Sequence, residues 1–193
     1  VLVAAGSYAG AGNRNLDFGG CNIKLIAPAG PGATAVDLEG AGRFLYLSNG
    51  ETKTGSRVAG FAISNGNADY GGAIRIAGNT GLTVIDCVFS DNQATGCGGA
   101  VFVAGGAVDL LETRFTSNRQ TPDDFAWEED GGGAVCASGA TIRLEKCVFE
   151  TNDALAGGAL NVSGGALEAL ACVFRYNTAG TGGAVYAASD ATL

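Results

Sequence analysis

The sequence predicts an all-β fold, a parallel β-helix of about seven coils with roughly 25 residues each. Two short phrases support this prediction because they recur with one shared period. One set of GGA phrases, each followed by Ile, Val or Leu, begins at Gly71, Gly98, Gly132, Gly157 and Gly182. The phrase Phe-x-x-Asn recurs at Phe89–Asn92, Phe115–Asn118, Phe149–Asn152 and Phe174–Asn177. Successive Phe residues lie 26, 34 and 25 positions apart, so each pair of phrases marks one coil.

The strands of one repeat follow from the stretch TIRLEKCVFETN. Apolar residues fall at Ile142 and Leu144 and again at Cys147 and Phe149, and a step of two is the spacing of a β-strand. The step of three between the pairs predicts a bend, and the alternation resumes after GGA. Each repeat is therefore expected to hold three short strands. Equivalent slots elsewhere hold Leu82, Val84, Cys87 and Phe89, then Val108, Leu110, Thr113 and Phe115, and finally Leu167, Ala169, Cys172 and Phe174.

Strands this short can bury their apolar side chains if each coil stacks on near-copies of itself, with equivalent residues about 4.8 Å apart. We expect the Phe side chains to fill the interior and the paired glycines to form corners that a Cβ would disfavour. The Asn residues at the same corner tolerate the left-handed backbone conformation and are expected to hydrogen-bond along a ladder. These structural residues are Phe89, Phe115, Phe149, Phe174, Asn92, Asn118, Asn152 and Asn177.

Composition excludes several classes of protein. Glycine accounts for 33 of 193 residues, but it follows no strict three-residue period, which argues against collagen. Only three prolines occur and apolar residues recur regularly, which argues against disorder. The net charge of −8 and the lack of a basic stripe argue against nucleic-acid binding. No stretch is apolar for long enough to predict a membrane span. Histidine is absent, which excludes Ser-His, Cys-His and His-zinc mechanisms within these residues.

The paired GGA and Phe-x-x-Asn phrases resemble the repeats of the chlamydial polymorphic outer-membrane proteins, and more broadly the parallel β-helix repeats of many secreted and surface proteins. The resemblance covers residues 61–193 closely and residues 1–60, with less regular coils, more loosely. It implies one right-handed β-helix domain over residues 1–193, located at the cell surface or outside the cell. Because stacked coils need polar caps and neither Val1 nor Leu193 lies in one, we expect a fragment of a longer chain or ends covered by a partner.

The cysteines suggest buried thiols and one candidate disulfide. Cys87, Cys147 and Cys172 share the inward slot two residues before Phe, where Cys behaves as a small hydrophobic residue. Cys147 and Cys172 should stack on adjacent coils, so they are a candidate disulfide, although parallel side chains strain such a bond. Cys97 and Cys136 are expected to point outward at different corners, which argues against their pairing. No cysteine spacing predicts a zinc site.

One coil is about eight residues longer than its neighbours. Its extra stretch, RQTPDDFAWEEDG, occupies residues 119–131, and a loop inserted in a solenoid often carries function. The candidate calcium ligands are the carboxylates of Asp123, Asp124, Glu128, Glu129 and Asp130. The candidate contacts to a sugar or a partner protein are Phe125 and Trp127. The alternative is a solvated acidic loop with no ligand.

Asn161 begins an Asn-Val-Ser glycosylation sequon, and its register predicts an outward-facing side chain. The sequence makes Asn161 a candidate glycosylation site if the chain passes through a eukaryotic secretory pathway.

Two functions stay open at the level of sequence. The first is a non-catalytic structural or adhesive solenoid that contacts proteins or glycans, with no cofactor other than a possible calcium ion. The alternative is a polysaccharide-active enzyme of the lyase, hydrolase or epimerase type, on the pectin-lyase-like fold. Such enzymes use clustered carboxylates or a basic residue with calcium. The outward slots after GGA instead hold Arg75, Phe102, Cys136, Asn161 and Tyr186.

Overall fold

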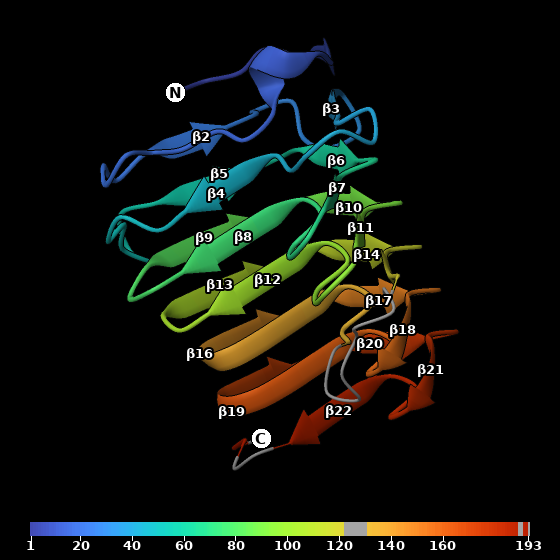
Figure 1. Cartoon of the computed structure of the whole chain (residues 1–193). Coiled ribbons are helices and arrows are strands. Elements are labelled where there is room, and N and C mark those ends of the chain that lie inside the picture. The colour runs from blue at the N-terminus through green and yellow to red at the C-terminus, as the bar shows by residue number, and fades with distance from the viewer. Residues whose placement is uncertain (122–130, 189–190, 193) are drawn as a thin grey trace.

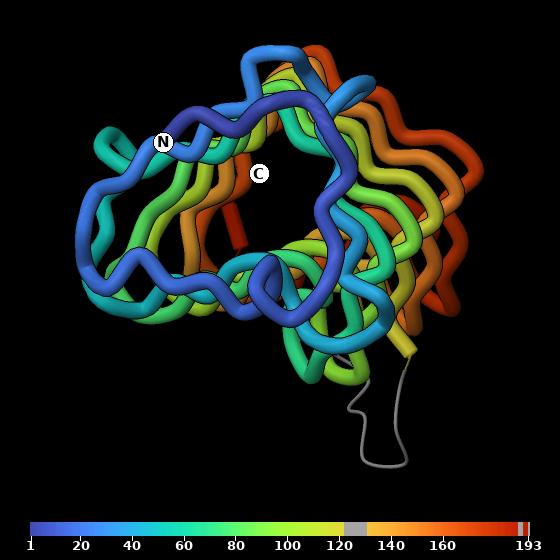
Figure 2. The backbone as a smooth tube through the Cα atoms, turned by 90° about the horizontal axis from the view of Figure 1, so that it is seen from above, coloured from blue at the N-terminus to red at the C-terminus, as the bar shows by residue number. Residues whose placement is uncertain are grey.

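The computed structural model describes residues 1–121, 131–188 and 191–192. Within them, short strands and one 3-10 turn, η1 (Ala11–Asn13), wind into a right-handed parallel β-helix of about seven coils (Figure 1). The two ends of the chain lie at opposite ends of the coil stack (Figure 1). Figure 2 looks along the stack and shows successive coils following similar paths. The predicted fold class is confirmed.

Three parallel sheets form the sides of the coil. A seven-stranded sheet contains β1 (Gly6–Tyr8), β3 (Thr34–Asp37), β6 (Ala62–Ser64), β10 (Val88–Ser90), β14 (Arg114–Thr116), β17 (Val148–Glu150) and β20 (Val173–Arg175). A five-stranded sheet contains β7 (Asn67–Ala68), β11 (Gln93–Ala94), β15 (Arg119–Gln120), β18 (Asp153–Ala156) and β21 (Thr178–Thr181). The largest sheet contains β2 (Lys24–Ile26), β4 (Leu45–Leu47), β5 (Arg57–Ala59), β8 (Ile74–Ala77), β9 (Gly81–Ile85), β12 (Val101–Ala104), β13 (Ala107–Leu111), β16 (Val135–Glu145), β19 (Leu160–Leu170) and β22 (Val185–Ala188).

The largest sheet takes two strand segments from each coil. In earlier coils these segments are separate strands, such as β12 and β13, whereas β16 and β19 each join them into one strand of 11 residues. Two further GGA phrases, at Gly105 and Gly164, mark this junction rather than a corner. Two of the three predicted strands per repeat therefore belong to one sheet. The third side of each coil is formed by the short strand after each Asn. The sequence pattern does not predict this strand.

Each coil turns at residues in the left-handed conformation. At the bend before the seven-stranded sheet they are Asp86, Glu112, Lys146 and Ala171, with φ between 48° and 54°. At the next corner they are Asp91, Ser117, Thr151 and Tyr176, with φ between 54° and 56°. The left-handed residue at this corner is not the Asn but the residue before it, which makes the turn and leaves the Asn side chain directed inward. The third corner uses the first glycine of GGA, with φ of 70° at Gly98.

The predicted Phe stack forms the centre of the core. The rings of Phe89, Phe115, Phe149 and Phe174 lie 5.1, 4.8 and 4.9 Å apart between successive centroids and are nearly parallel. Phe89, Phe115 and Phe149 are fully buried. The same row continues through Ile63 in the neighbouring coil, so the ladder register predicted from sequence is confirmed.

The asparagines form the predicted ladder beside this stack. Asn118 Nδ2 donates to the carbonyl of Phe89 at 2.9 Å and to Oδ1 of Asn152 at 3.0 Å. Asn118 Oδ1 in turn accepts from the amide N–H of Asn92 at 3.1 Å. Asn152 repeats both donor contacts one coil further, to Phe115 and Asn177. The amides therefore satisfy the buried polar groups at this corner and serve the fold.

The cysteines pair differently from the expectation. Cys97 and Cys136 form a disulfide with their Cα atoms 5.7 Å apart. They meet because the corner at Gly98, directly after Cys97, lies against the backbone of Cys136 in the next coil. Cys147 and Cys172 are thiols, so the disulfide predicted for them is wrong; the Cys147 thiol instead donates to the carbonyl of Leu110 at 3.1 Å. Burial raises the pKa of the Cys87 and Cys147 thiols to about 12.

Candidate binding surface

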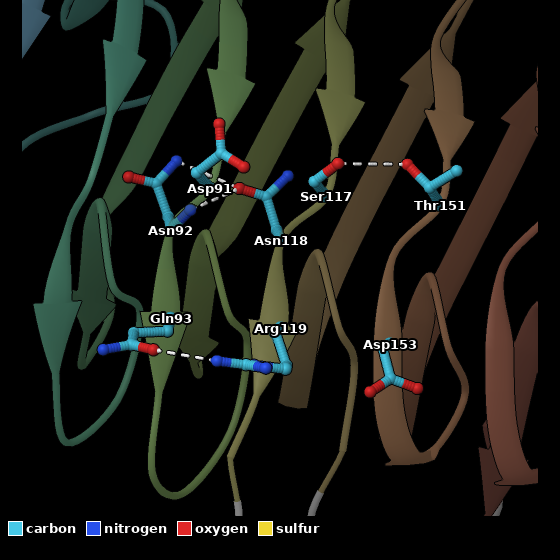
Figure 3. A pocket seen from close by; sticks show the side chains of 8 residues that line it. All are labelled: Asp91, Asn92, Gln93, Ser117, Asn118, Arg119, Thr151 and Asp153. Atoms are coloured by element: carbon cyan, nitrogen blue, oxygen red, sulfur yellow. Dashed lines mark hydrogen bonds between the residues drawn. The ribbon is translucent and has the colours of Figure 1, made fainter.

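A polar groove runs along the corner of the coil where the Asn ladder lies. Its central part has a volume of about 370 Å³ and is shown in Figure 3. A second part of about 390 Å³ continues it toward the N-terminal coils and shares Asp91 and Gln93 with the first. We call the two parts together the corner groove. Its lining residues are Asp37, Glu39, Gly40, Asn65, Gly66, Asp91, Asn92, Gln93, Ser117, Asn118, Arg119, Thr151 and Asp153.

The turn geometry sets which side chains face the corner groove. The left-handed residue before each Asn projects its side chain outward, as Asp91, Ser117 and Thr151 do (Figure 3). The residue after each Asn lies on the outer side of the short strand, and Arg119 of β15 is one such residue. Neighbouring coils also hydrogen-bond across the surface: the hydroxyls of Ser117 and Thr151 are 3.2 Å apart, and Arg119 donates to Gln93 Oε1 at 3.4 Å.

Carboxylates dominate the charge of the corner groove. They belong to Asp37, Glu39, Asp91 and Asp153, and the cation among the lining residues is Arg119. A hydrogen bond from Asn65 Nδ2 at 2.9 Å, with another from the Glu39 N–H, lowers the pKa of Asp37. Asp37 is therefore ionised at neutral pH. The arrangement presents negative charge at intervals along the solenoid axis.

Asp91 lies where the two parts of the corner groove meet. It is exposed, and within the described part of the chain no hydrogen bond or ion pair engages its carboxylate. Glu39 at one end is instead paired with Arg14 at 3.1 Å, and Asp153 accepts from the Thr178 hydroxyl at 2.7 Å. Asp91 is thus the carboxylate of the corner groove most available to a ligand.

The sequence analysis did not identify the corner groove. Its residues occupy the variable positions beside each Asn, and they change from coil to coil. A signal does exist in the sequence, because the residue before and the residue after every ladder Asn must face outward. Asp91, Arg119 and Asp153 could have been found from that register alone.

The residues that the sequence singled out in the acidic insertion lie outside the described part of the chain. They are Asp123, Asp124, Phe125, Trp127, Glu128, Glu129 and Asp130. The proposals of a calcium site and of an aromatic contact there stay predictions. Among the residues that are described, no group of three or more acidic or cysteine side chains is arranged to hold a metal ion.

Asn161 occupies the predicted row on the outer face of β19, next to Cys136 in register. Its side chain is nevertheless buried, with an exposed fraction of 1%. The expectation of an exposed sequon is wrong, because the corner at Gly131 lies against the Asn161 amide. Whether Asn161 is glycosylated stays a prediction, and modification would have to precede burial.

Residues 86–104 and 171–188 match the family model of the Chlamydia polymorphic membrane protein repeat. Each segment runs from a left-handed bend, through the Phe-x-x-Asn corner, to the strand after GGA. These two segments are similar to the chlamydial polymorphic membrane protein repeat. Both segments lie in the parallel coils described above, so the resemblance in sequence and the observed architecture agree.

A relative from Escherichia coli extends the similarity. The chain is 32% identical over 124 residues to the probable autotransporter YfaL of Escherichia coli (strain K12). The aligned segment is 62% of this chain and 9% of YfaL. No solved structure matches. The two similarities indicate a protein of the cell-surface or outer-membrane type. The described residues contain no helix long and apolar enough to span a membrane.

Proposed function

We propose that the chain is a non-catalytic adhesive solenoid that binds an extended, basic segment of a partner protein along the corner groove. The observation that carries this proposal is the repetition of carboxylates along one corner, with the Asp91 carboxylate available at its middle. The autotransporter-like similarity supports a surface location, where such a groove meets other proteins.

The spacing of the carboxylates suits an extended peptide. Asp37 and Asp91 lie two coils apart on the same corner, which is roughly 10 Å at the usual strand separation. Three residues of a peptide in the polyproline II conformation, with three residues per turn and a rise of about 3.1 Å per residue, span about the same distance. Basic side chains at every third position of such a peptide lie on one face, so each could face a carboxylate. The net charge of −8 adds long-range attraction for a basic partner.

Binding of synthetic peptides tests this proposal. A labelled peptide with Lys at every third position and Ser or Thr between should bind, and its counterpart with Glu should not. The double variant Asp91→Asn, Asp153→Asn should weaken binding about two- to fivefold, and added salt should weaken binding to the original chain. Fluorescence anisotropy at several salt concentrations measures both effects.

Asp86→Asn is a matched control. Asp86 is exposed and left-handed like Asp91 and lies in the same coil, but at a different corner. Asn tolerates the left-handed conformation at both positions, so the variants differ mainly in where charge is lost. Equal weakening by Asp86→Asn and Asp91→Asn would reject the corner groove as the site. Cleavage of pectin or alginate by the purified chain would reject the non-catalytic assignment.

A further inference from the structure

A second concave site lies at a different corner of the coil. It has a volume of about 190 Å³ and opens on the outer face of β12, β16 and β19. We call it the disulfide pocket, and it shares no lining residue with the corner groove. Its lining residues are Tyr70, Cys97, Phe102, Cys136, Ala137, Ser138, Asn161 and Ser163. None of them is charged.

One wall of the disulfide pocket is aromatic and held in place. The ring centroids of Tyr70 and Phe102 lie 4.9 Å apart. The Arg75 guanidinium lies over both rings, 5.3 Å from the Tyr70 centroid and 6.0 Å from the Phe102 centroid. An ion pair with Asp69 at 3.2 Å holds the guanidinium in turn. Tyr70 therefore keeps a fixed position although 36% of it is exposed.

The other walls supply neutral hydrogen-bonding groups on rigid backbone. Ser138 and Ser163 are neighbours in the ladder between β16 and β19, and Asn161, two residues before Ser163 on the same face, is buried. A serine hydroxyl both donates and accepts hydrogen bonds. The disulfide between Cys97 and Cys136 ties the corner that carries one wall to the strand that carries the other.

We propose that the disulfide pocket binds one neutral pyranose ring of a glycan. A pyranose has an apolar C–H face, which would pack on the Tyr70 ring, and a rim of hydroxyls, which would bond to the hydroxyls of Ser138 and Ser163. A pocket without charged walls favours an uncharged ligand, because an ion would lose hydration without a partner. The volume lies below the usual range of about 300–1,000 Å³ for drug-sized ligands. The pocket therefore holds one ring rather than an oligosaccharide.

Saturation-transfer NMR with methyl glycosides of neutral hexoses and N-acetylhexosamines tests this proposal. At least one glycoside should receive saturation through its C–H face. Tyr70→Ala should lower the affinity for that glycoside about tenfold, whereas Tyr70→Phe should retain it because the ring face is kept. Ser138→Ala should lower affinity less, through loss of one hydrogen bond.

Tyr176→Ala is the control, since Tyr176 is 77% exposed and lies at the corner of the Asn ladder. It should leave glycoside binding unchanged. The basic peptide should bind Tyr70→Ala as it binds the original chain, which shows that this variant is folded and separates the two sites. The pocket proposal is overturned if no neutral glycoside binds, or if Tyr70→Ala and Tyr176→Ala bind it equally. A preference for a sialic acid glycoside would also overturn it.

Discussion

At the scale of single residues, Asn92, Asn118 and Asn152 each link three coils. The Asn118 amide bonds to the coil before it through Phe89 and Asn92, and to the coil after it through Asn152. All of these groups are buried, so water cannot replace the bonds. The Asn118 side chain therefore provides hydrogen-bond partners for several buried polar groups that would otherwise be unsatisfied.

Asn118→Ala should lower the free energy of unfolding by about 3–4 kcal/mol, because it leaves a buried carbonyl and a buried N–H unpaired. Asn177→Ala should cost less, since Asn177 is only half-buried. Ser117→Ala, at an exposed neighbouring position, should change stability by less than about 0.5 kcal/mol. Urea denaturation of the three variants measures the differences. Similar losses for Asn118→Ala and Ser117→Ala would show that the ladder bonds contribute little.

At the scale of the structural elements, corners decide how coils lie on one another. The second glycine of GGA shows this, because a Cβ at Gly99 would lie 2.1 Å from the carbonyl oxygen of Gly133 in the next coil. Backbone from adjacent coils meets at this corner without intervening side chains. The same close approach brings Cys97, just before the corner, to Cys136.

The disulfide should stabilise the pairing of the coil that contains the inserted segment with the coil before it. Cys97 and Cys136 are 39 residues apart in sequence, so replacing both with Ser should lower the free energy of unfolding by about 3–4 kcal/mol. Cys21→Ser, at an exposed thiol, should have little effect. Urea denaturation measures the change, and mass spectrometry of an unreduced digest identifies the linked peptides. Recovery of a Cys147–Cys172 peptide instead would contradict the structure.

The elements differ in how far sequence alone could predict them. The Phe and Asn rows were predictable because a stacked coil repeats its inward residues. The strand β11 was not, because its two residues carry no apolar alternation. The Cys97–Cys136 disulfide was not predicted. The strand register predicts which coil and which face a residue belongs to, but it does not predict how closely the corner of one coil approaches the next coil. The corner groove was missed because its outward side chains need not repeat.

At the scale of the whole molecule, the chain is nearly one-dimensional. Each strand of the seven-stranded sheet pairs only with the coil before and the coil after it. In such an array, stability is approximately the sum of the coils' own stabilities and the terms for their interfaces. Phe115 contributes to two interfaces, because its ring stacks between Phe89 and Phe149. A destabilising substitution in one coil should therefore lower the stability of the adjacent coils more than that of distant coils.

Phe115→Ala tests this local coupling. The substitution should remove about 3–5 kcal/mol from the interfaces on both sides of Phe115. Hydrogen exchange should then show loss of amide protection in β10, β14 and β17, while β1 and β3 keep most of theirs because their interfaces are intact. Ile63→Val, a conservative change in the same row, should cost only about 0.5–1.5 kcal/mol. It should preserve the protection pattern. Uniform loss of protection from β1 to β20 in Phe115→Ala would instead mean that the solenoid unfolds as one cooperative unit, with coupling that extends beyond adjacent coils.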